Sequence, residues 1–97
     1  MLEARLETYF YRRVKRDLSG IVVKLAPTVV GVPDRLVVLS DGRIYLVELK
    51  TLAGRLSPAQ QAWHAKAAAL GAPVVVLYGR FGIEKWVDER LAEVAPI

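Results

Sequence analysis

Two charged residues, Glu48 and Lys50, lie where an unpaired charge is energetically unfavourable. They end the apolar run Ile44–Val47, which predicts a buried strand. An ionised carboxylate at the end of such a strand is unfavourable unless it is paired or binds a metal. Because side chains alternate along a strand, Glu48 and Lys50 share one face. The sequence therefore predicts a carboxylate and an amine presented side by side at the mouth of a sheet.

A second carboxylate, Asp34, begins the preceding strand, and its distance from Glu48 depends on the turn between the strands. With a two-residue turn, Arg35 would face Glu48 in a cross-strand ion pair without chemistry. With the three-residue turn Ser40–Gly42, Asp34 faces Glu48 instead. Such a turn needs a left-handed residue at its last position, and a glycine occupies it. We therefore favour the register that brings the two carboxylates together.

Converging carboxylates at Asp34 and Glu48 would suit a divalent cation. Two carboxylate oxygens, a backbone carbonyl and waters match the preferences of Mg²⁺. Such an ion polarises a phosphate and lowers the pKa of an attacking water. Lys50 would orient that water or neutralise charge that builds on the phosphate. Zinc is not expected, because the chain has a single histidine and no cysteine.

The element pattern predicts an α/β fold in the order helix, strand, strand, strand, helix, strand, helix. Helices are predicted over Leu2–Leu18, Ser57–Leu70 and Ile83–Val94, and strands over Ile21–Leu25, Arg35–Leu39, Arg43–Leu49 and Pro73–Tyr78. In the last helix, Ile83, Trp86, Val87, Leu91 and Val94 are expected to face inward. The two strands around the second helix must be parallel and the hairpin antiparallel, which gives a mixed sheet. Both faces of the hairpin strands are apolar, so burial on both sides is expected.

Length and composition indicate one small, basic domain over residues 1–97. The chain is 54% hydrophobic, so we expect apolar surface that a second copy would cover, giving a homodimer. The net charge of +4 favours a polyanionic partner. The absence of cysteine excludes disulfides. Neither a signal peptide nor a membrane span is expected, which is compatible with a cytoplasmic protein.

Three short motifs, in order, carry a family resemblance. They are the Gly-Val-Pro-Asp segment Gly31–Asp34, the Glu-Leu-Lys segment Glu48–Lys50 and the Pro-Ala-Gln segment Pro58–Gln60. Together they resemble the PD-(D/E)xK nuclease superfamily and, within it, stand-alone phage-type members of the virus-type replication-repair nuclease (VRR-NUC) family. The resemblance extends over nearly the whole chain.

This resemblance implies a fold and an activity. The fold would be a restriction-endonuclease-like core, a mixed four-stranded sheet flanked by helices. The activity would be Mg²⁺- or Mn²⁺-dependent, structure-selective cleavage of DNA, including resolution of Holliday junctions by homodimers. The alternative is a non-catalytic module that binds branched DNA, or a nuclease subunit that acts only within a larger replication-repair assembly.

The resemblance also implies roles for individual residues. Asp34 and Glu48 would be metal ligands, with the Leu49 carbonyl as a third, and Lys50 would be the catalytic lysine. Gln60 would lie near the site and touch the water or phosphate. Its alternative is purely structural, since Ser-x-x-Gln is a capping box in which Gln60 reaches back to the start of its helix.

Further residues have open roles. The family places an acidic residue on the first helix, and Glu3 and Glu7 both match, although either could simply form helix ion pairs. His64 lies four residues after Gln60 on the same helix face. A solvated or hydrogen-bonded histidine is expected there, with contact to a phosphate as the alternative. Four cations are expected to bind DNA phosphates around the site without reading sequence: Lys24, Arg35, Arg43 and Arg55.

Overall fold

The computed structural model describes residues 4–93, and the order of its elements is the predicted one. The elements are α1 (Ala4–Asp17), β1 (Ile21–Lys24), β2 (Arg35–Val38), β3 (Ile44–Lys50), α2 (Pro58–Ala69), β4 (Val74–Tyr78) and α3 (Gly79–Glu93). The predicted α/β class, a mixed four-stranded sheet flanked by helices, is confirmed. Within residues 4–93 no helix has the length and apolar character needed to cross a membrane.

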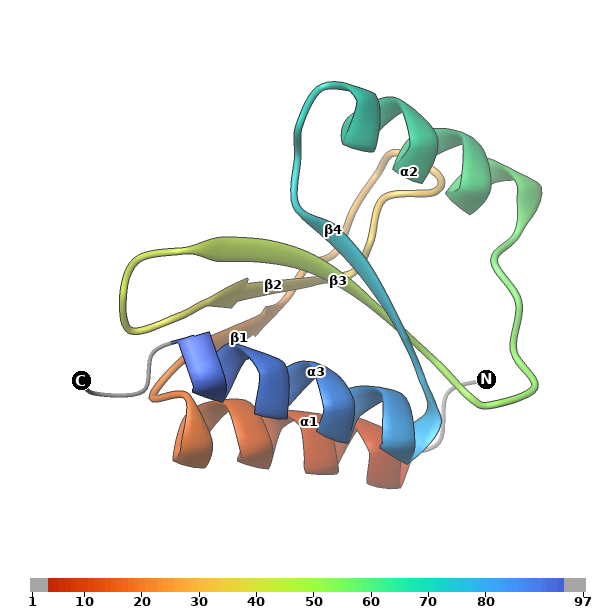
Figure 1. Ribbon diagram of the computed structural model, residues 1–97. Helices are drawn as coiled ribbons and strands as arrows, with labels where there is room; N and C mark the ends of the chain where they lie inside the picture. Colours follow the sequence, from red (N-terminus) through yellow and green to blue (C-terminus); the bar gives the residue numbers. More distant parts are fainter. Residues whose placement is uncertain (1–3, 94–97) are drawn as a thin grey trace.

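The strands form one sheet in the order β1-β2-β3-β4 (Figure 1). β1, β2 and β3 are antiparallel neighbours, whereas β4 runs parallel to β3. A parallel pair needs a crossover connection, and α2 supplies it. Because β3 and β4 run in the same direction, they end at the same edge of the sheet, where Lys50 is paired with Tyr78.

The hairpin between β2 and β3 has the three-residue turn that the glycine predicts. Val38 lies opposite Ile44, and just beyond them the Leu39 amide donates to the Arg43 carbonyl at 2.8 Å. The turn is therefore Ser40–Gly42, and its glycine has a φ of 88°, in the left-handed region. The two-residue alternative is wrong.

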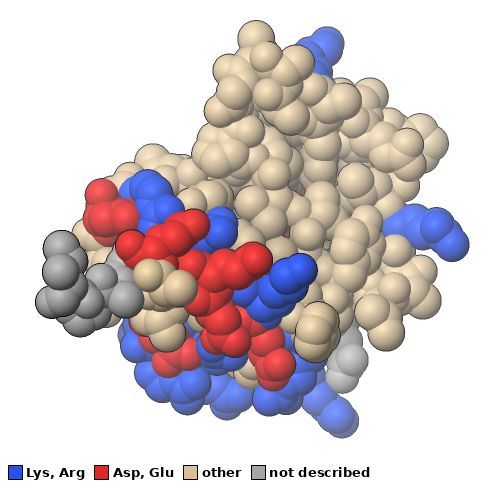
Figure 2. Space-filling model, in the orientation of Figure 1, with Lys and Arg blue, Asp and Glu red and all other residues tan. Residues whose placement is uncertain are grey.

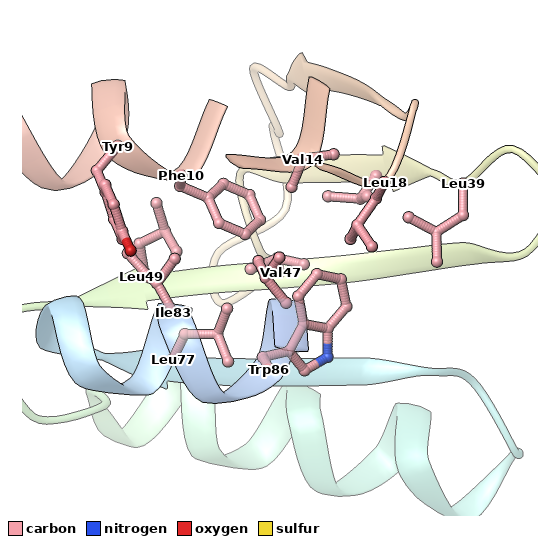
Figure 3. Packing of buried hydrophobic residues seen from close by; sticks show 12 residues of the cluster. Tyr9, Phe10, Val14, Leu18, Leu39, Val47, Leu49, Leu77, Ile83 and Trp86 are labelled. Atoms are coloured by element: carbon pink, nitrogen blue, oxygen red, sulfur yellow. The ribbon is translucent and has the colours of Figure 1, made fainter. Parts of the chain in front are cut away.

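One face of the sheet is covered by α1 and α3, which lie side by side beneath it (Figure 1). The apolar stripe of α1 and the inward residues of α3 meet the middle of β3 in a continuous core (Figure 3). Its fully buried members include Phe10, Val14, Val47, Ile83 and Val87. Burial of this apolar surface is the main stabilising contribution in the fold.

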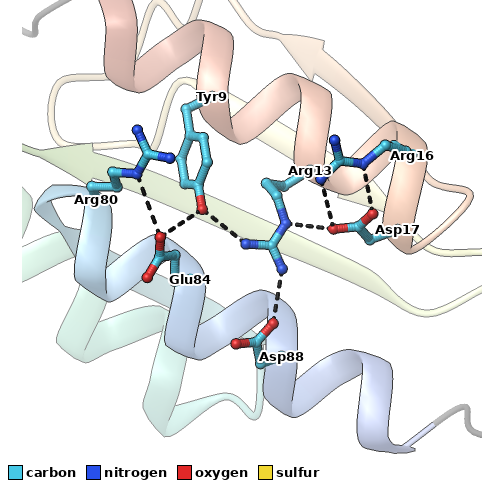
Figure 4. A network of polar contacts seen from close by, with 7 residues as sticks. All are labelled: Tyr9, Arg13, Arg16, Asp17, Arg80, Glu84 and Asp88. Carbon is cyan, nitrogen blue, oxygen red and sulfur yellow. Dashed lines mark hydrogen bonds and ion pairs between the residues drawn. The ribbon is translucent and has the colours of Figure 1, made fainter.

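A polar network joins α1 to α3 beside this core (Figure 4). The Tyr9 hydroxyl donates to Glu84 at 3.0 Å, and Arg13 donates to Tyr9 and to Asp88, both at 2.8 Å. Arg80 lies over the Tyr9 ring, 4.1 Å from its centroid. These contacts fix the two helices against each other.

The opposite face of the sheet is only partly covered. α2 stands off the sheet (Figure 1) and lies against the loop before β2, where a Cβ on Gly31 would come within 2.4 Å of the Ala59 carbonyl oxygen. Ile21, Val23 and Ile44 remain exposed. In the hairpin strands themselves, the residues on this side range from the exposed Ile44 to the buried Glu48. The expected burial of both faces is therefore only partly met.

The last helix begins earlier than predicted, and one of its expected inward residues is exposed. It begins at Gly79, four residues before the predicted Ile83, because the positive φ of Gly79 (64°) turns the chain directly from β4 into the helix. Ile83, Trp86 and Val87 are buried as expected. Leu91 is exposed, contrary to expectation, and Val94 lies outside the described residues.

Candidate functional site

A cavity of about 480 Å³ lies at the edge of the sheet where β3 ends. α1, β1, the start of β2, the end of β3 and the following loop all contribute to its wall. Its lining residues are Glu7, Lys24, Asp34, Arg35, Glu48, Leu49, Lys50, Thr51, Gly54 and Arg55. The hairpin motif residues and several predicted accessory residues thus meet in one place.

Asp34 and Glu48 meet because of the hairpin register. Arg35 pairs with Val47, so the next step along the ladder sets Asp34 opposite Glu48 on the same face. Glu48 is only 8% exposed. Its burial, and then the negative charge of Asp34, raise the pKa of Glu48, while Lys50 and Arg35 act in the opposite direction. The two carboxylates are thus close enough to repel each other.

The Glu48 carboxylate lacks full compensation from the protein. Its ion-pair partner is Lys50, whose Nζ is 3.9 Å from Oε2, beyond hydrogen-bond distance. A buried carboxylate beside a second one is the environment that a cation stabilises. Oxygen donors of this kind fit Mg²⁺ or Mn²⁺, which retain part of their water shell. Among residues 4–93 no third Asp, Glu, His or Cys completes a cluster with Asp34 and Glu48.

Arg35 is not at the rim of the site, and its assignment as a phosphate-binding residue is corrected. It is 2% exposed, and its guanidinium bonds Glu7 of α1 and, at 2.7 Å, the Asp34 carboxylate. A cation so enclosed and already engaged by two carboxylates is not available to a phosphate. Arg35 instead joins α1 to the start of β2 and holds the Asp34 side chain.

Of the two acidic residues predicted on the first helix, Glu7 lines the cavity, while Glu3 lies outside the described residues. Glu7 accepts from Arg35 and from Lys24, the latter at 3.4 Å. Burial tends to raise the pKa of Glu7, but the charges of Arg35 and Lys24 outweigh it and hold the pKa below its usual value. Glu7 is therefore an ionised partner of Arg35 at physiological pH.

The other predicted cations divide into two groups. Lys24 and Arg55 line the cavity, as expected for residues that would meet phosphates. Arg43 does not: it lies at the turn end of the hairpin and pairs with Asp41 at 2.7 Å and Glu93 at 2.6 Å. β3 separates Arg43 from the site, so its expected place beside the site is wrong.

Gln60 forms the capping box of α2. Its Oε1 accepts from the Ser57 amide at 2.8 Å, and its own amide donates to the Ser57 hydroxyl at 3.1 Å. Gln60 is absent from the cavity lining. The structural alternative is therefore realised, and the role of Gln60 at the water or phosphate stays a prediction.

Two aspects of the surroundings escape the sequence reasoning. His64 is buried, and its Nε2 has no hydrogen-bond partner, whereas a solvated or hydrogen-bonded histidine is expected. Burial, and then the charge of Lys50, lower the pKa of His64, so the imidazole is neutral at neutral pH.

Tyr78 is the second residue near the site that the sequence does not reveal. It pairs with Lys50 in the β3–β4 ladder. Only the register of a parallel pair, which no sequence signal sets here, reveals this neighbour.

Comparisons with known proteins identify the family of this chain. The family model described as the VRR-NUC domain matches residues 9–81. A protein of Acyrthosiphon pisum secondary endosymbiont phage 1, named "Putative nuclease p44", is 44% identical over 63 residues, which are 64% of this chain and 68% of that protein. A solved structure described as a VRR_NUC domain has a TM-score of 0.75 at 34% identity, covering 96% of this chain and 97% of its own. The chain belongs to the VRR-NUC domain family.

Proposed function

We propose that this protein is a metal-dependent, structure-selective endonuclease that hydrolyses phosphodiester bonds in DNA. The observation that carries the proposal is the pairing of Asp34 with the buried Glu48 in a cavity that also holds Lys50. Membership of the VRR-NUC family and the name of the phage relative support nuclease activity. The basic balance of the chain favours a polyanionic substrate.

The residues divide the work as follows. Asp34 and Glu48 would hold Mg²⁺ or Mn²⁺, with the Leu49 carbonyl as a further oxygen ligand. The ion, when bound, supplies a Lewis acid for the phosphate and lowers the pKa of a water. Lys50 presents its ammonium beside these carboxylates, where it stabilises negative charge that develops on the phosphate. Arg35 orients Asp34 by direct hydrogen bonding.

Lys24 and Arg55 would position the DNA backbone. Both line the cavity, and phosphate contacts of this kind fix register without reading sequence. Nothing in the described residues resembles a helix or zinc module that reads base edges. Selection would therefore rest on the shape of the DNA, with branched and junction structures as the proposed substrates.

The proposal includes a homodimer, because two strands of a junction need two sites. The open face of the sheet offers the surface, since Ile21 and Val23 on β1 and Ile44 on β3 lie exposed there. Charged side chains gather over α1 and α3, whereas the surface over α2 and the adjoining sheet is almost free of them (Figure 2). An apolar, uncharged face of this kind favours a partner surface of the same character.

Sedimentation tests the dimer. We expect the wild type to sediment as a dimer at micromolar concentration and Ile44→Glu to be monomeric with an unchanged circular dichroism spectrum. Leu91→Glu is the matched control, because Leu91 is an apolar residue of similar exposure (42% against 49%) on α3, which covers the other face of the sheet. A monomeric wild type would contradict the dimer without affecting the carboxylate site.

A cleavage assay tests the activity. Wild type, Asp34→Ala and Glu48→Ala are incubated with a four-way junction, a flap and plain duplex, in Mg²⁺ or EDTA. We expect metal-dependent cutting of branched DNA by the wild type. Both variants should lose about 10²- to 10³-fold in rate, the loss seen when a group that stabilises transition-state charge is removed. Asp41→Ala is the matched control, because it removes a carboxylate from the same hairpin at the far end of β3.

The assay also decides the second candidate function, a non-catalytic module that binds branched DNA or a subunit active only within a larger assembly. Tight junction binding without cutting in Mg²⁺ or Mn²⁺ would favour that function over the enzyme. The non-catalytic function is disfavoured by the carboxylates of Asp34 and Glu48 beside Lys50, because binding alone does not require a carboxylate pair next to a lysine.

A further inference from the structure

A second cavity, of about 550 Å³, adjoins the candidate site. It shares Gly54 and Arg55 with the first cavity. Its lining is otherwise uncharged and consists of Leu52, Ala53, Leu56, Gln61 and Tyr78. Its size lies within the range of about 300–1,000 Å³ typical of small-ligand pockets. The two cavities thus form a pair, one charged and one largely apolar, with a common wall.

Tyr78 places an aromatic ring in the second cavity directly beside the lysine of the first. It pairs with Lys50 in the parallel ladder, so the two side chains leave the same face of strands that lie about 4.8 Å apart. Tyr78 is 38% exposed, and among the described residues no ring or guanidinium stacks on it. Its ring face is therefore available to a ligand.

Gly54 lies in the wall that the two cavities share and packs close to Lys50. A Cβ at this position would lie 3.2 Å from the Thr51 carbonyl oxygen and 3.3 Å from the Lys50 Cβ, so a larger residue would crowd the lysine. Arg55 faces both cavities, and no described residue forms an ion pair with it. A phosphate held near Lys50 and Arg55 would thus have its attached nucleoside within reach of the Tyr78 ring.

We propose that this second cavity binds one unstacked nucleobase from a nucleotide adjoining the scissile phosphate, with the base stacked on Tyr78 and flanked by Leu52. The proposal rests on the proposed nuclease function and adds the means of selection. A base inside a duplex is covered on both faces by its neighbours, whereas a nucleotide at a branch or flap can offer its ring. Aromatic stacking combined with a basic groove is the usual way that proteins bind unpaired nucleotides.

The test measures whether the loss from removing the Tyr78 ring depends on the presence of the base that it would contact. The cleaved bond is first mapped on a flap substrate, and the nucleotide on either side is then replaced, one at a time, by an abasic residue. Base stacking on an aromatic side chain is worth about 1–3 kcal/mol, or roughly 5- to 150-fold. We expect Tyr78→Ala to lower kcat/KM on the flap by about tenfold. One abasic substitution should lower the wild-type value equally, with no further loss in the variant.

Matched variants separate stacking from folding. Tyr78→Phe keeps the ring and should behave as wild type. Phe81→Ala removes an aromatic that is 74% exposed at the same end of the molecule but lines neither cavity, and it should also be neutral. On plain duplex, Tyr78→Ala should match the wild type, so that the preference for branched DNA falls.

Two results would overturn the proposal. In the first, Tyr78→Ala and the abasic residue lower kcat/KM independently, so that their fold-losses multiply when they are combined. In the second, Tyr78→Ala lowers kcat/KM equally on duplex and on flap. If the wild type cuts no DNA in Mg²⁺ or Mn²⁺, the proposed nuclease function fails separately. Binding affinity is then measured for the same four combinations, wild type and Tyr78→Ala with the intact and the abasic flap. Losses of affinity that do not add support the base pocket, and independent losses overturn it.

Discussion

The two faces of the sheet differ in what holds them. On the face covered by α1 and α3 the sheet meets a continuous apolar core, and a polar network fixes both helices. On the other face α2 stands off, apolar side chains remain exposed, and Asp34, Glu48 and Lys50 gather at the edge. Stability is thus concentrated on one face, which leaves the other free to carry a costly carboxylate pair.

The helices explain this difference. α1 presents large residues at helical spacing to the core, where Tyr9, Phe10 and Val14 are buried. α2 is rich in alanine, and its buried residues are His64 and Ala67, which cover little area. An alanine-rich helix buries too little apolar surface to complete a second core. The capping box stabilises the start of α2, and the close approach of Gly31 to Ala59 sets its contact with the loop before β2.

The sharpest test of this asymmetry is truncation of one apolar residue on each face. Phe10→Ala removes a fully buried ring from the core and should lower the free energy of unfolding by about 3–5 kcal/mol. Ile44→Ala removes a side chain that is 49% exposed on the open face and should cost about 1 kcal/mol or less. Urea denaturation measures both. Similar losses would show that the open face is as well packed as the core.

The next largest loss of stability should come from replacing Arg35, which links Glu7 on α1 to Asp34 in the candidate site. Arg35→Met leaves Glu7 and Asp34 without their buried partner. Loss of a fully buried partner costs about 3–5 kcal/mol, and because both carboxylates are partly exposed here, we expect about 2 kcal/mol. Arg16→Met, at an exposed ion pair with Asp17, is the control and should be nearly neutral.

The same variant carries a signature in pH. The folded-state pKa of Glu7 is depressed, so its contribution to stability is present above the unfolded pKa and is lost as the pH falls through the folded pKa. Arg35→Met should flatten this acid limb of the stability curve. An acid limb as steep as in the wild type would show that Arg35 does not hold Glu7 in its ionised form.

Arg35 also shows where sequence reasoning ends. The turn Ser40–Gly42 was predictable because a local glycine sets it, and with it came the alignment of Asp34 and Glu48. The burial of Arg35 depends on Glu7, which is 28 residues away on another element. No local pattern encodes such a contact.

Other gaps have the same origin. The neighbours Lys50 and Tyr78 follow from the register of two strands separated by a helix, which no turn sets. The open face was missed because apolar strand residues look alike whether or not a helix covers them. Element order and type were predictable, since they depend on periodicity and on glycine and proline positions.

Replacing Glu48 should change the melting temperature by less, but the direction of the change reports on its ionisation. Its folded-state pKa is raised, so its favourable contribution is complete below the unfolded pKa and is lost as the pH rises through the folded pKa. Without divalent metal, Glu48→Gln should therefore raise the melting temperature at pH 7 but not at pH 4. Mg²⁺ should stabilise the wild type and not the variant. A wild type that Mg²⁺ leaves unchanged would argue against the metal site.

The smallest expected effect concerns Gln60, where capping and chemistry can be separated. Gln60→Glu preserves the capping box, because Ser-x-x-Glu closes the same two hydrogen bonds, whereas Gln60→Ala breaks one of them. We expect Gln60→Ala to cost about 0.5 kcal/mol in thermal unfolding, at the low end for loss of a cap, and Gln60→Glu to be neutral. Ser57→Ala is the control that removes the cap without touching Gln60 chemistry. If capping alone matters, cleavage by Gln60→Glu matches the wild type. A loss of cleavage in Gln60→Glu at unchanged stability would instead place the Gln60 amide at the water or phosphate and give α2 a direct part in the open face's chemistry.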